Sequence, residues 1–304
     1  MRKFAFVLFI ALSVSLASFG LAQKGTLTVG SKIDTEGSVL AQLILQVLEH
    51  NGIPTEDRSG FGTTSVVREA LLAGEIDLYP EYTGTALTFF DEAPADVATD
   101  AALLYDTVAE LDAANGVSWL ARSPANNTWA IAVPQALADE NDLSTMADLA
   151  EYVSSGGEFK LAASQEFVDR DDALKAFEAT YGFDVTDDQL VILAGGNTTQ
   201  TETAAAQGTD GVNAAMAYGT DGAIGALGLV ALTDPEGAVA IYQPAPTVRT
   251  EVLEAYPQLP ELLDPVFALL DEATLAELNG RVAVDGENAA AVAEDFLSSN
   301  GLLE

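Results

Sequence analysis

Short apolar runs alternate with amphipathic segments over most of this chain, and this alternation constrains the fold more than any other feature. Residues 26–32, TLTVGSK, have the character of a buried strand. Residues 36–52 follow as a helix whose apolar side chains recur with the spacing of one face, and Asn51 and Gly52 end it. Its apolar face consists of Leu40, Leu43, Ile44, Val47 and Leu48.

The order of strand and helix continues along the chain. A glycine-rich turn is expected at residues 59–65, a helix at 66–74 with Gly74 as its C-terminal cap, and a strand at 75–80. Thr35 is expected to cap the N-terminus of the first helix. This alternation predicts α/β architecture.

The second half of the chain repeats the pattern. Strands are expected at 128–134, 159–163, 190–193, 212–218 and 238–246, and helices at 146–154, 173–181, 200–207, 260–282 and 288–303. No long linker rich in Pro or Gly separates the halves. We therefore expect two lobes, with lobe 2 (residues 131–242) inserted into lobe 1 (residues 23–130 and 243–304), so that the chain crosses between them twice.

The N-terminus has the pattern of a secretory signal peptide. Arg2 and Lys3 precede an uncharged run at residues 4–21, and the small-residue ending Gly20 to Ala22 predicts cleavage after Ala22. The predicted signal peptide is residues 1–22, and the mature protein is expected to be periplasmic or secreted. The chain has no cysteine, so it offers neither a lipid-acceptor cysteine nor a disulfide.

The charge balance bears on the partners. The chain has 47 acidic and 12 basic residues, a formal net charge of −35. A surface this acidic repels phosphate backbones, so nucleic acid is excluded as a partner. Solubility in concentrated salt is a second interpretation of the same acidity.

The residues offer little for catalysis. His50 is the only histidine and lies at the polar end of a predicted helix, and no zinc-ligand spacing occurs. The acidic segment 184–189 is interpreted as a solvated loop rather than a calcium site. We therefore expect a protein that is not an enzyme and that has no cofactor or metal.

Aromatic residues and scarce cations occur at the predicted strand ends. Each aromatic ring alone is as well explained by core packing, but together they indicate an aromatic box; they are Tyr82, Trp129, Tyr218 and Tyr242. Lys32 follows the first strand and Arg170 follows the strand at 159–163, at the edge where open α/β sheets bind ligands. Lys32 could equally be a surface lysine, and Arg170 could pair with a neighbouring aspartate, Asp169, Asp171 or Asp172.

The sequence resembles the substrate-binding proteins of osmoprotectant importers of the ATP-binding-cassette type, which carry glycine betaine, choline and related quaternary amines. The matching segments follow the family order over nearly the whole mature chain; they are VGSKIDTEGSVLAQL, GFGTT, REALLAGEIDLYPEYTGTA, NNTWAIAV, EF followed by R, AYGTDGAI and PAPTVR. The resemblance implies a type II periplasmic-binding-protein fold with two crossover strands, a ligand in the cleft between the lobes, and closure about hinges near residues 127–130 and 241–247.

Site residues follow from the same resemblance. It implies a cage around a methylated ammonium, formed by Tyr82, Trp129, Tyr218 and Tyr242, and a ligand carboxylate engaged by Lys32, Thr85 and Arg170. The cage would present Tyr82 as an exposed side chain at its strand end. Two departures alter the pocket: Trp129 stands where the family usually has tyrosine, and Asp34 where an aromatic residue is common.

The resemblance also ranks the functions. Glycine betaine is the first expected ligand, with carnitine, proline betaine and choline as alternatives, and the closed protein is expected to act as a monomer that meets a membrane permease. An exported enzyme on the same scaffold and a sensor without a transport partner are the remaining alternatives.

Overall fold

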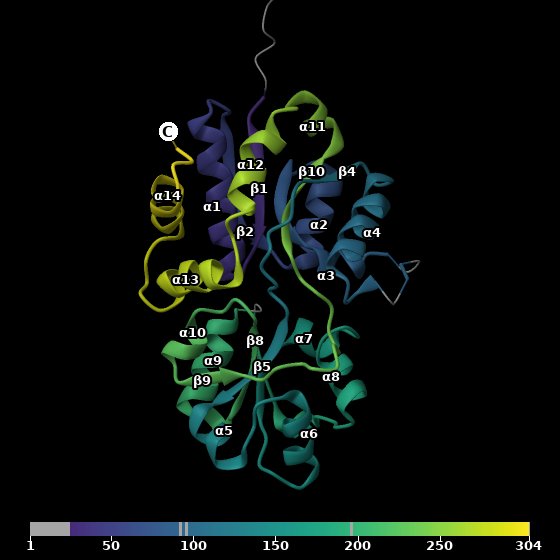
Figure 1. Cartoon of the computed structure of the whole chain (residues 1–304), viewed down its shortest axis with the longest axis vertical. Coiled ribbons are helices and arrows are strands. Elements are labelled where there is room, and N and C mark those ends of the chain that lie inside the picture. The colour runs from purple at the N-terminus through teal and green to yellow at the C-terminus, as the bar shows by residue number, and fades with distance from the viewer. Residues whose placement is uncertain (1–24, 91–92, 95–96, 195–196, 304) are drawn as a thin grey trace, which may run out of the picture.

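The computed structural model describes residues 25–90, 93–94, 97–194 and 197–303, and it consists of two α/β lobes along its long axis (Figure 1). The predicted signal peptide lies outside the described residues. Each lobe is built on a five-stranded mixed sheet. The predicted two-lobed α/β architecture is confirmed. Within the described ranges, no helix combines the length and the apolar character that a membrane crossing requires.

The first sheet has the strand order β2-β1-β3-β10-β4. Its strands are β1 (Leu27–Lys32), β2 (Thr55–Gly62), β3 (Leu78–Tyr82), β4 (Val117–Trp119) and β10 (Pro244–Arg249). β1 runs parallel to β2 and β3, whereas β10 runs antiparallel to β3 and β4. The carboxyl ends of β1 and β3, at Lys32 and Tyr82, therefore lie at the same edge of the sheet, which faces the other lobe (Figure 1).

Helices cover this sheet. They are α1 (Thr35–His50), α2 (Thr64–Ala73), α3 (Thr83–Leu87), α4 (Ala101–Ala113), α11 (Thr250–Ala255), α12 (Leu259–Phe267), α13 (Glu272–Ala283) and α14 (Ala289–Ser299). α1 buries the face that its sequence predicts: Leu40, Leu43, Ile44 and Leu48 have no exposed surface. Gly74 ends α2 in the left-handed conformation, with φ of 74°, as predicted.

The second sheet has the strand order β7-β6-β8-β5-β9. Its strands are β5 (Trp129–Pro134), β6 (Leu161–Ser164), β7 (Leu190–Leu193), β8 (Ala214–Tyr218) and β9 (Leu229–Ala231). Its helices are α5 (Gln135–Asn141), α6 (Met146–Ser154), α7 (Gln165–Asp169), α8 (Leu174–Tyr181), α9 (Thr198–Gln207) and α10 (Ala223–Ala226), with short 3₁₀ turns η2 (Asp187–Gln189) and η3 (Thr209–Gly211).

The chain passes between the sheets in two segments, residues 120–128 and 232–243, which connect β4 to β5 and β9 to β10. These segments are hydrogen-bonded to each other. The Asn127 backbone N–H donates to the carbonyl of Tyr242 (2.9 Å), and the Tyr242 N–H donates to Asn126 Oδ1 (2.8 Å). The two crossings therefore run side by side and deliver Trp129 and Tyr242 to the same place.

Three local expectations are wrong. The turn expected at 59–65 is partly strand, because β2 continues through Gly62 and bends at Gly60, whose φ is 68°. The cap of α1 is Asp34 rather than Thr35, since its carboxylate accepts from the Gly37 N–H (2.6 Å). The strand expected at 238–246 begins only at Pro244, because the residues before it form the second crossing.

A buried ion pair connects α2, α4 and β4 in lobe 1. Arg68 donates two bonds to Asp112, and the indole N–H of Trp119 also donates to Asp112 (2.8 Å). Asp112 has no exposed surface and Arg68 is 6% exposed. A buried ion pair is weak evidence of net stability, but removal of one partner leaves the other charge unpaired.

We expect Asp112→Ala to lower the free energy of unfolding by roughly 3–5 kcal/mol, because it leaves the buried Arg68 guanidinium and the Trp119 indole N–H without their acceptor. Urea unfolding followed by circular dichroism measures this. The matched control is Glu110→Ala, on the exposed face of the same helix, for which we expect a change within about 0.5 kcal/mol. Equal changes in the two variants would contradict the structural role assigned to the pair.

Candidate ligand-binding site

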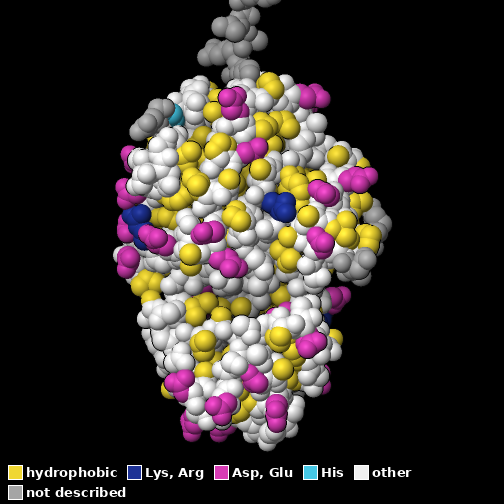
Figure 2. All heavy atoms as spheres, viewed as in Figure 1, with side chains coloured by type: hydrophobic (Ala, Val, Ile, Leu, Met, Phe, Trp, Pro, Cys, Tyr) yellow, Lys and Arg dark blue, Asp and Glu magenta, His cyan; other side chains and the backbone are white. Residues whose placement is uncertain are grey.

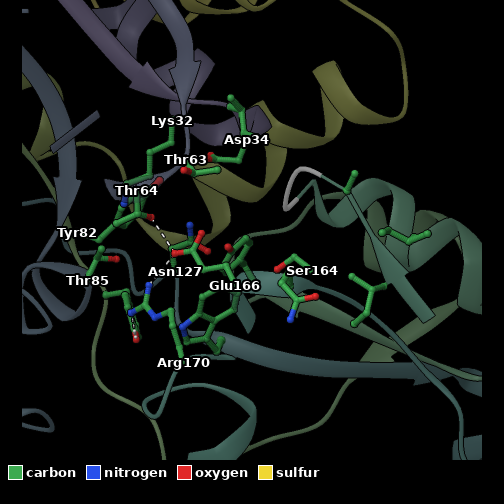
Figure 3. Close-up of a pocket in the computed structure, with 18 residues that line it drawn as sticks. Lys32, Asp34, Thr63, Thr64, Tyr82, Thr85, Asn127, Ser164, Glu166 and Arg170 are labelled. Carbon is green, nitrogen blue, oxygen red and sulfur yellow. Dashed lines mark hydrogen bonds and ion pairs between the residues drawn. The ribbon is translucent and has the colours of Figure 1, made fainter. Parts of the chain in front are cut away.

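A cavity of about 380 Å³ lies between the lobes, at the carboxyl ends of their strands (Figure 3). All seven residues that the sequence singled out line it, namely Lys32, Tyr82, Thr85, Trp129, Arg170, Tyr218 and Tyr242. Asp34 lines it too, and so do side chains that the sequence analysis did not single out, among them Thr63, Thr64, Asn127, Ser164 and Glu166. The cavity thus draws on both lobes and on the crossings.

Three of the four aromatic rings lie together, with Trp129 between Tyr218 and Tyr242 in the contacts they make. The ring of Tyr218 lies 4.6 Å from that of Trp129, measured between centroids, and the ring of Tyr242 lies 6.4 Å away at 78°. Sheet register explains the first contact, because Trp129 on β5 is directly opposite Tyr218 on β8. Phe167, 5.1 Å from Trp129, packs behind it. The rings of Trp129, Tyr218 and Tyr242 thus pack against one another in the wall of the cavity.

Tyr82 contributes the ring from lobe 1, but it is not the exposed side chain that the sequence analysis expected. It is 5% exposed, because β3 lies inside its sheet and its phenol reaches inward. The hydroxyl donates to Glu36 Oε1 (2.8 Å), and the Lys32 ammonium lies 4.8 Å from the ring centroid. Thr85, also 5% exposed, follows one turn later at the cavity wall.

The Lys32 ammonium is already paired with a buried acid. Lys32 Nζ lies 2.5 Å from Glu81 Oε1, and Glu81 has no exposed surface. Glu81 also accepts from the Tyr79 hydroxyl (2.8 Å) and the Tyr82 backbone N–H (2.7 Å). Lys32 is therefore not a surface lysine. A sequence signal for Glu81 existed, since an acid in the middle of an otherwise apolar central strand needs a partner.

Arg170 is held by two carboxylates. Its Nε and one terminal nitrogen donate to the two oxygens of Asp172 (2.8 and 2.5 Å), and the other terminal nitrogen donates to Glu166 Oε1 (3.0 Å). The guanidinium lies 5.6 Å from the Trp129 ring centroid. Burial alone would raise the pKa of Asp172, but the hydrogen bonds and charge of Arg170 lower it below its usual value. Of the pairings left open by the sequence, Asp172 is the one that forms.

Glu36, which the sequence analysis missed, accepts hydrogen bonds from four donors on both sides of the cleft. They are Tyr82 Oη (2.8 Å), Asn127 Nδ2 (3.0 Å), Asn279 Nδ2 (2.7 Å) and Thr220 Oγ1 (2.5 Å). Tyr82 and Asn279 belong to the first lobe and Thr220 follows β8 of the second. The Glu36 carboxylate thus connects the two lobes by hydrogen bonds, one of which comes directly from Tyr82, a ring of the expected cage.

The lobes are also in close contact at Gly222, two residues after Thr220. A Cβ atom on Gly222 would lie 2.2 Å from the carbonyl oxygen of Ala276 and 2.4 Å from the backbone nitrogen of Gly280, so only glycine fits there. This contact places α10 against α13 (Figure 1). Nearby, the Asp221 carboxylate accepts a hydrogen bond from the backbone N–H of Tyr218 (2.7 Å) and so fixes the backbone at the end of β8.

The visible face of the molecule carries many Asp and Glu side chains and few Lys or Arg (Figure 2). The cavity itself is lined by two acids, Asp34 and Glu166, and by two cations, Lys32 and Arg170. Burial raises the pKa of Asp34, while its hydrogen bond from Gly37 lowers it. Among the described residues, no cluster of three His, Asp or Glu side chains could hold a metal ion. Because Lys32 and Arg170 are both paired with acids, the arrangement suits a ligand that brings a positive charge.

A cavity between two α/β lobes, lined by aromatic rings from both, defines a two-lobed solute-binding protein. The chain belongs to the family of the substrate-binding domain of ABC-type glycine betaine transport systems, whose model matches residues 25–299. The family inferred from the sequence motifs is confirmed.

Known proteins agree with this assignment. The chain is 52% identical over 289 residues to the glycine betaine-binding protein YehZ of Escherichia coli K12, and the match covers 95% of each chain. The structure of apo YehZ from E. coli has a TM-score of 0.70 at 53% identity and covers 92% of this chain and 100% of that one. A crystal structure of a glycine betaine/carnitine/choline ABC transporter protein matches with a TM-score of 0.72 at 21% identity. The match covers 91% of this chain and 100% of that one. The type II periplasmic-binding-protein fold is thereby confirmed.

The buried Glu36 carboxyl makes the free energy of unfolding depend on pH. Burial raises the pKa of Glu36 from 4.5 to about 7. Between these values the folded protein binds more protons than the unfolded chain, so the contribution of Glu36 to stability decreases as the pH rises through this window. We expect wild type to lose roughly 2–3 kcal/mol relative to Glu36→Gln between pH 5 and pH 8.

Urea unfolding of both proteins at intervals of pH measures this difference. The comparison isolates Glu36, because other titrating groups are present in both proteins and their contributions cancel. Parallel pH profiles for the two proteins would contradict the assignment of a strongly raised pKa to Glu36.

Proposed function

We propose that this protein captures glycine betaine in the cavity between its lobes and delivers it to an ABC permease. The observation that carries the proposal is that rings from four separated segments, Tyr82, Trp129, Tyr218 and Tyr242, line one cavity. The relative YehZ, by its name a glycine betaine-binding protein, supports the choice of ligand. In this role the protein works outside the cytoplasm, in the periplasm or secreted, as a monomer.

The chemistry of the ligand explains the choice of residues. A quaternary ammonium has no N–H to donate, so aromatic faces and negative charge are the groups that hold it. Each face contributes roughly 0.5–2 kcal/mol, and a charge-assisted hydrogen bond to the ligand carboxylate contributes about 1.5–3 kcal/mol. The four faces, together with the bonds that Arg170, Lys32 and Thr85 offer to the ligand carboxylate, are the proposed sources of the ~8 kcal/mol of micromolar binding.

Binding in this site implies closure of the lobes. The cavity takes side chains from both lobes, so a ligand inside it contacts both only when they approach each other. The paired crossings at 120–128 and 232–243 are the segments about which we propose the lobes rotate, and they include the hinges expected near Asn127 and Tyr242. The closed form is the one presented to the permease.

Choline is the second candidate, and a specific observation favours it. Both cations of the cavity are already neutralised by acids, Lys32 by Glu81 and Arg170 by Asp172 and Glu166. A ligand that carries only a positive charge needs no free cation in the pocket. Calorimetry with glycine betaine and with choline separates the two ligands directly.

We expect Trp129→Leu to weaken binding of both ligands about tenfold, because it removes the central π face of the cage. Trp129→Phe keeps a face and should retain most of the affinity. Isothermal titration calorimetry measures both, with Tyr152→Leu, a tyrosine of α6 outside the cavity, as the control that leaves affinity unchanged. If the Leu and Phe variants lose affinity equally, the cage does not bind through its π faces.

A further inference from the structure

Glu166 is a carboxylate that lies in the cavity without a role in the proposed function. It is the second residue of α7, and its side chain is 34% exposed. Figure 3 shows it in the space between Thr64, on the first lobe, and Arg170, on the second. A single oxygen, Oε1, accepts from Thr64 Oγ1 (2.9 Å) and from Arg170 (3.0 Å). Glu166 therefore bridges the two lobes across the cleft.

The bond from Arg170 to Glu166 differs from the bonds that hold the other acids. Asp172 receives two bonds from Arg170 and a third from the Tyr242 hydroxyl (2.8 Å), so it fixes the guanidinium in place. Glu166 accepts a single bond, from the remaining terminal nitrogen of Arg170, and both residues line the cavity. That nitrogen is the donor that a ligand carboxylate would use, so Glu166 stands where such a carboxylate would bind.

The side chain of Glu166 has room to leave this position. A second cavity, of about 600 Å³, adjoins the first, and Glu166 lines both. Its carboxylate can therefore turn away from Arg170 without displacing packed side chains. Its charge also acts on the cage: burial raises the pKa of Tyr218, and the negative charges of Asp34 and Glu166 raise it further.

We propose that Glu166 is an internal competitor for the carboxylate of the ligand, and that it sets the preference of the site between zwitterions and simple cations. This inference rests on the proposed function. A betaine carboxylate that takes the place of Glu166 on Arg170 exchanges one charge-assisted bond for another instead of adding one, and a carboxylate that binds beside Glu166 meets its negative charge. A choline-like cation leaves Glu166 in place and gains from its negative charge near the rings.

The test compares wild type with Glu166→Gln by titration calorimetry, with glycine betaine and choline as the two ligands. Glutamine keeps the shape and can accept from Thr64, but it binds the guanidinium without charge. We expect glycine betaine to bind about tenfold more tightly and choline severalfold more weakly. The matched control is Asp169→Asn, an exposed acid of the same helix outside both cavities, which should leave the ratio of the two affinities unchanged.

A second variant shows whether the competition acts through Arg170. In an Arg170→Ala background no guanidinium remains to compete for, so adding Glu166→Gln should no longer tighten glycine betaine binding. If wild type binds a ligand but Glu166→Gln changes both affinities in the same direction and to the same extent, the competition is refuted while the proposed function stands. If wild type and every variant bind neither ligand, the proposed function fails, and this inference fails with it.

Discussion

One buried carboxylate connects the architecture of this protein to its site. Glu36 accepts hydrogen bonds from Tyr82, Asn127, Thr220 and Asn279, which come from both lobes and from a crossing between them. A buried carboxylate needs such donors, because without them its charge would cost far more to desolvate than the fold could offset. The contact between the lobes and the orientation of the Tyr82 ring therefore depend on the same carboxylate.

Other acids around the site are also paired, in their case with the two cations of the cavity. Lys32 is matched by Glu81 and Arg170 by Asp172, each at hydrogen-bonding distance and each largely shielded from water. These pairs fix the two cations in position, and pairing also cancels much of their attraction for an anionic ligand group. The site therefore favours the positive end of a zwitterion over its negative end. An aromatic box set in acidic surroundings is an arrangement suited to a methylated ammonium, whose charge is permanent.

Much of the fold followed from the sequence, because it depends on periodicity. The apolar face of α1, the Gly74 cap and the bounds of α6 were predicted from spacing and turn residues. The four rings expected at strand ends do line one cavity, although Tyr242 lies in a crossing segment rather than in a strand. The buried acids were not predicted, because composition alone does not show which of the 47 acidic residues are buried. Glu36 did carry a signal, since it precedes Leu40 by four positions and so falls on the buried face of α1. The pairing of Lys32 and Arg170 depends on tertiary contacts that no local pattern encodes.

The central claim is that rings from both lobes surround a methylated nitrogen. Crystal structures of the protein with and without glycine betaine test it most directly. The account predicts that the ligand nitrogen lies within about 6 Å of the ring centroids of Trp129, Tyr218, Tyr242 and Tyr82, and that the lobes are closer together in the complex. A nitrogen bound by one lobe alone, away from these rings, or an unchanged angle between the lobes would contradict it.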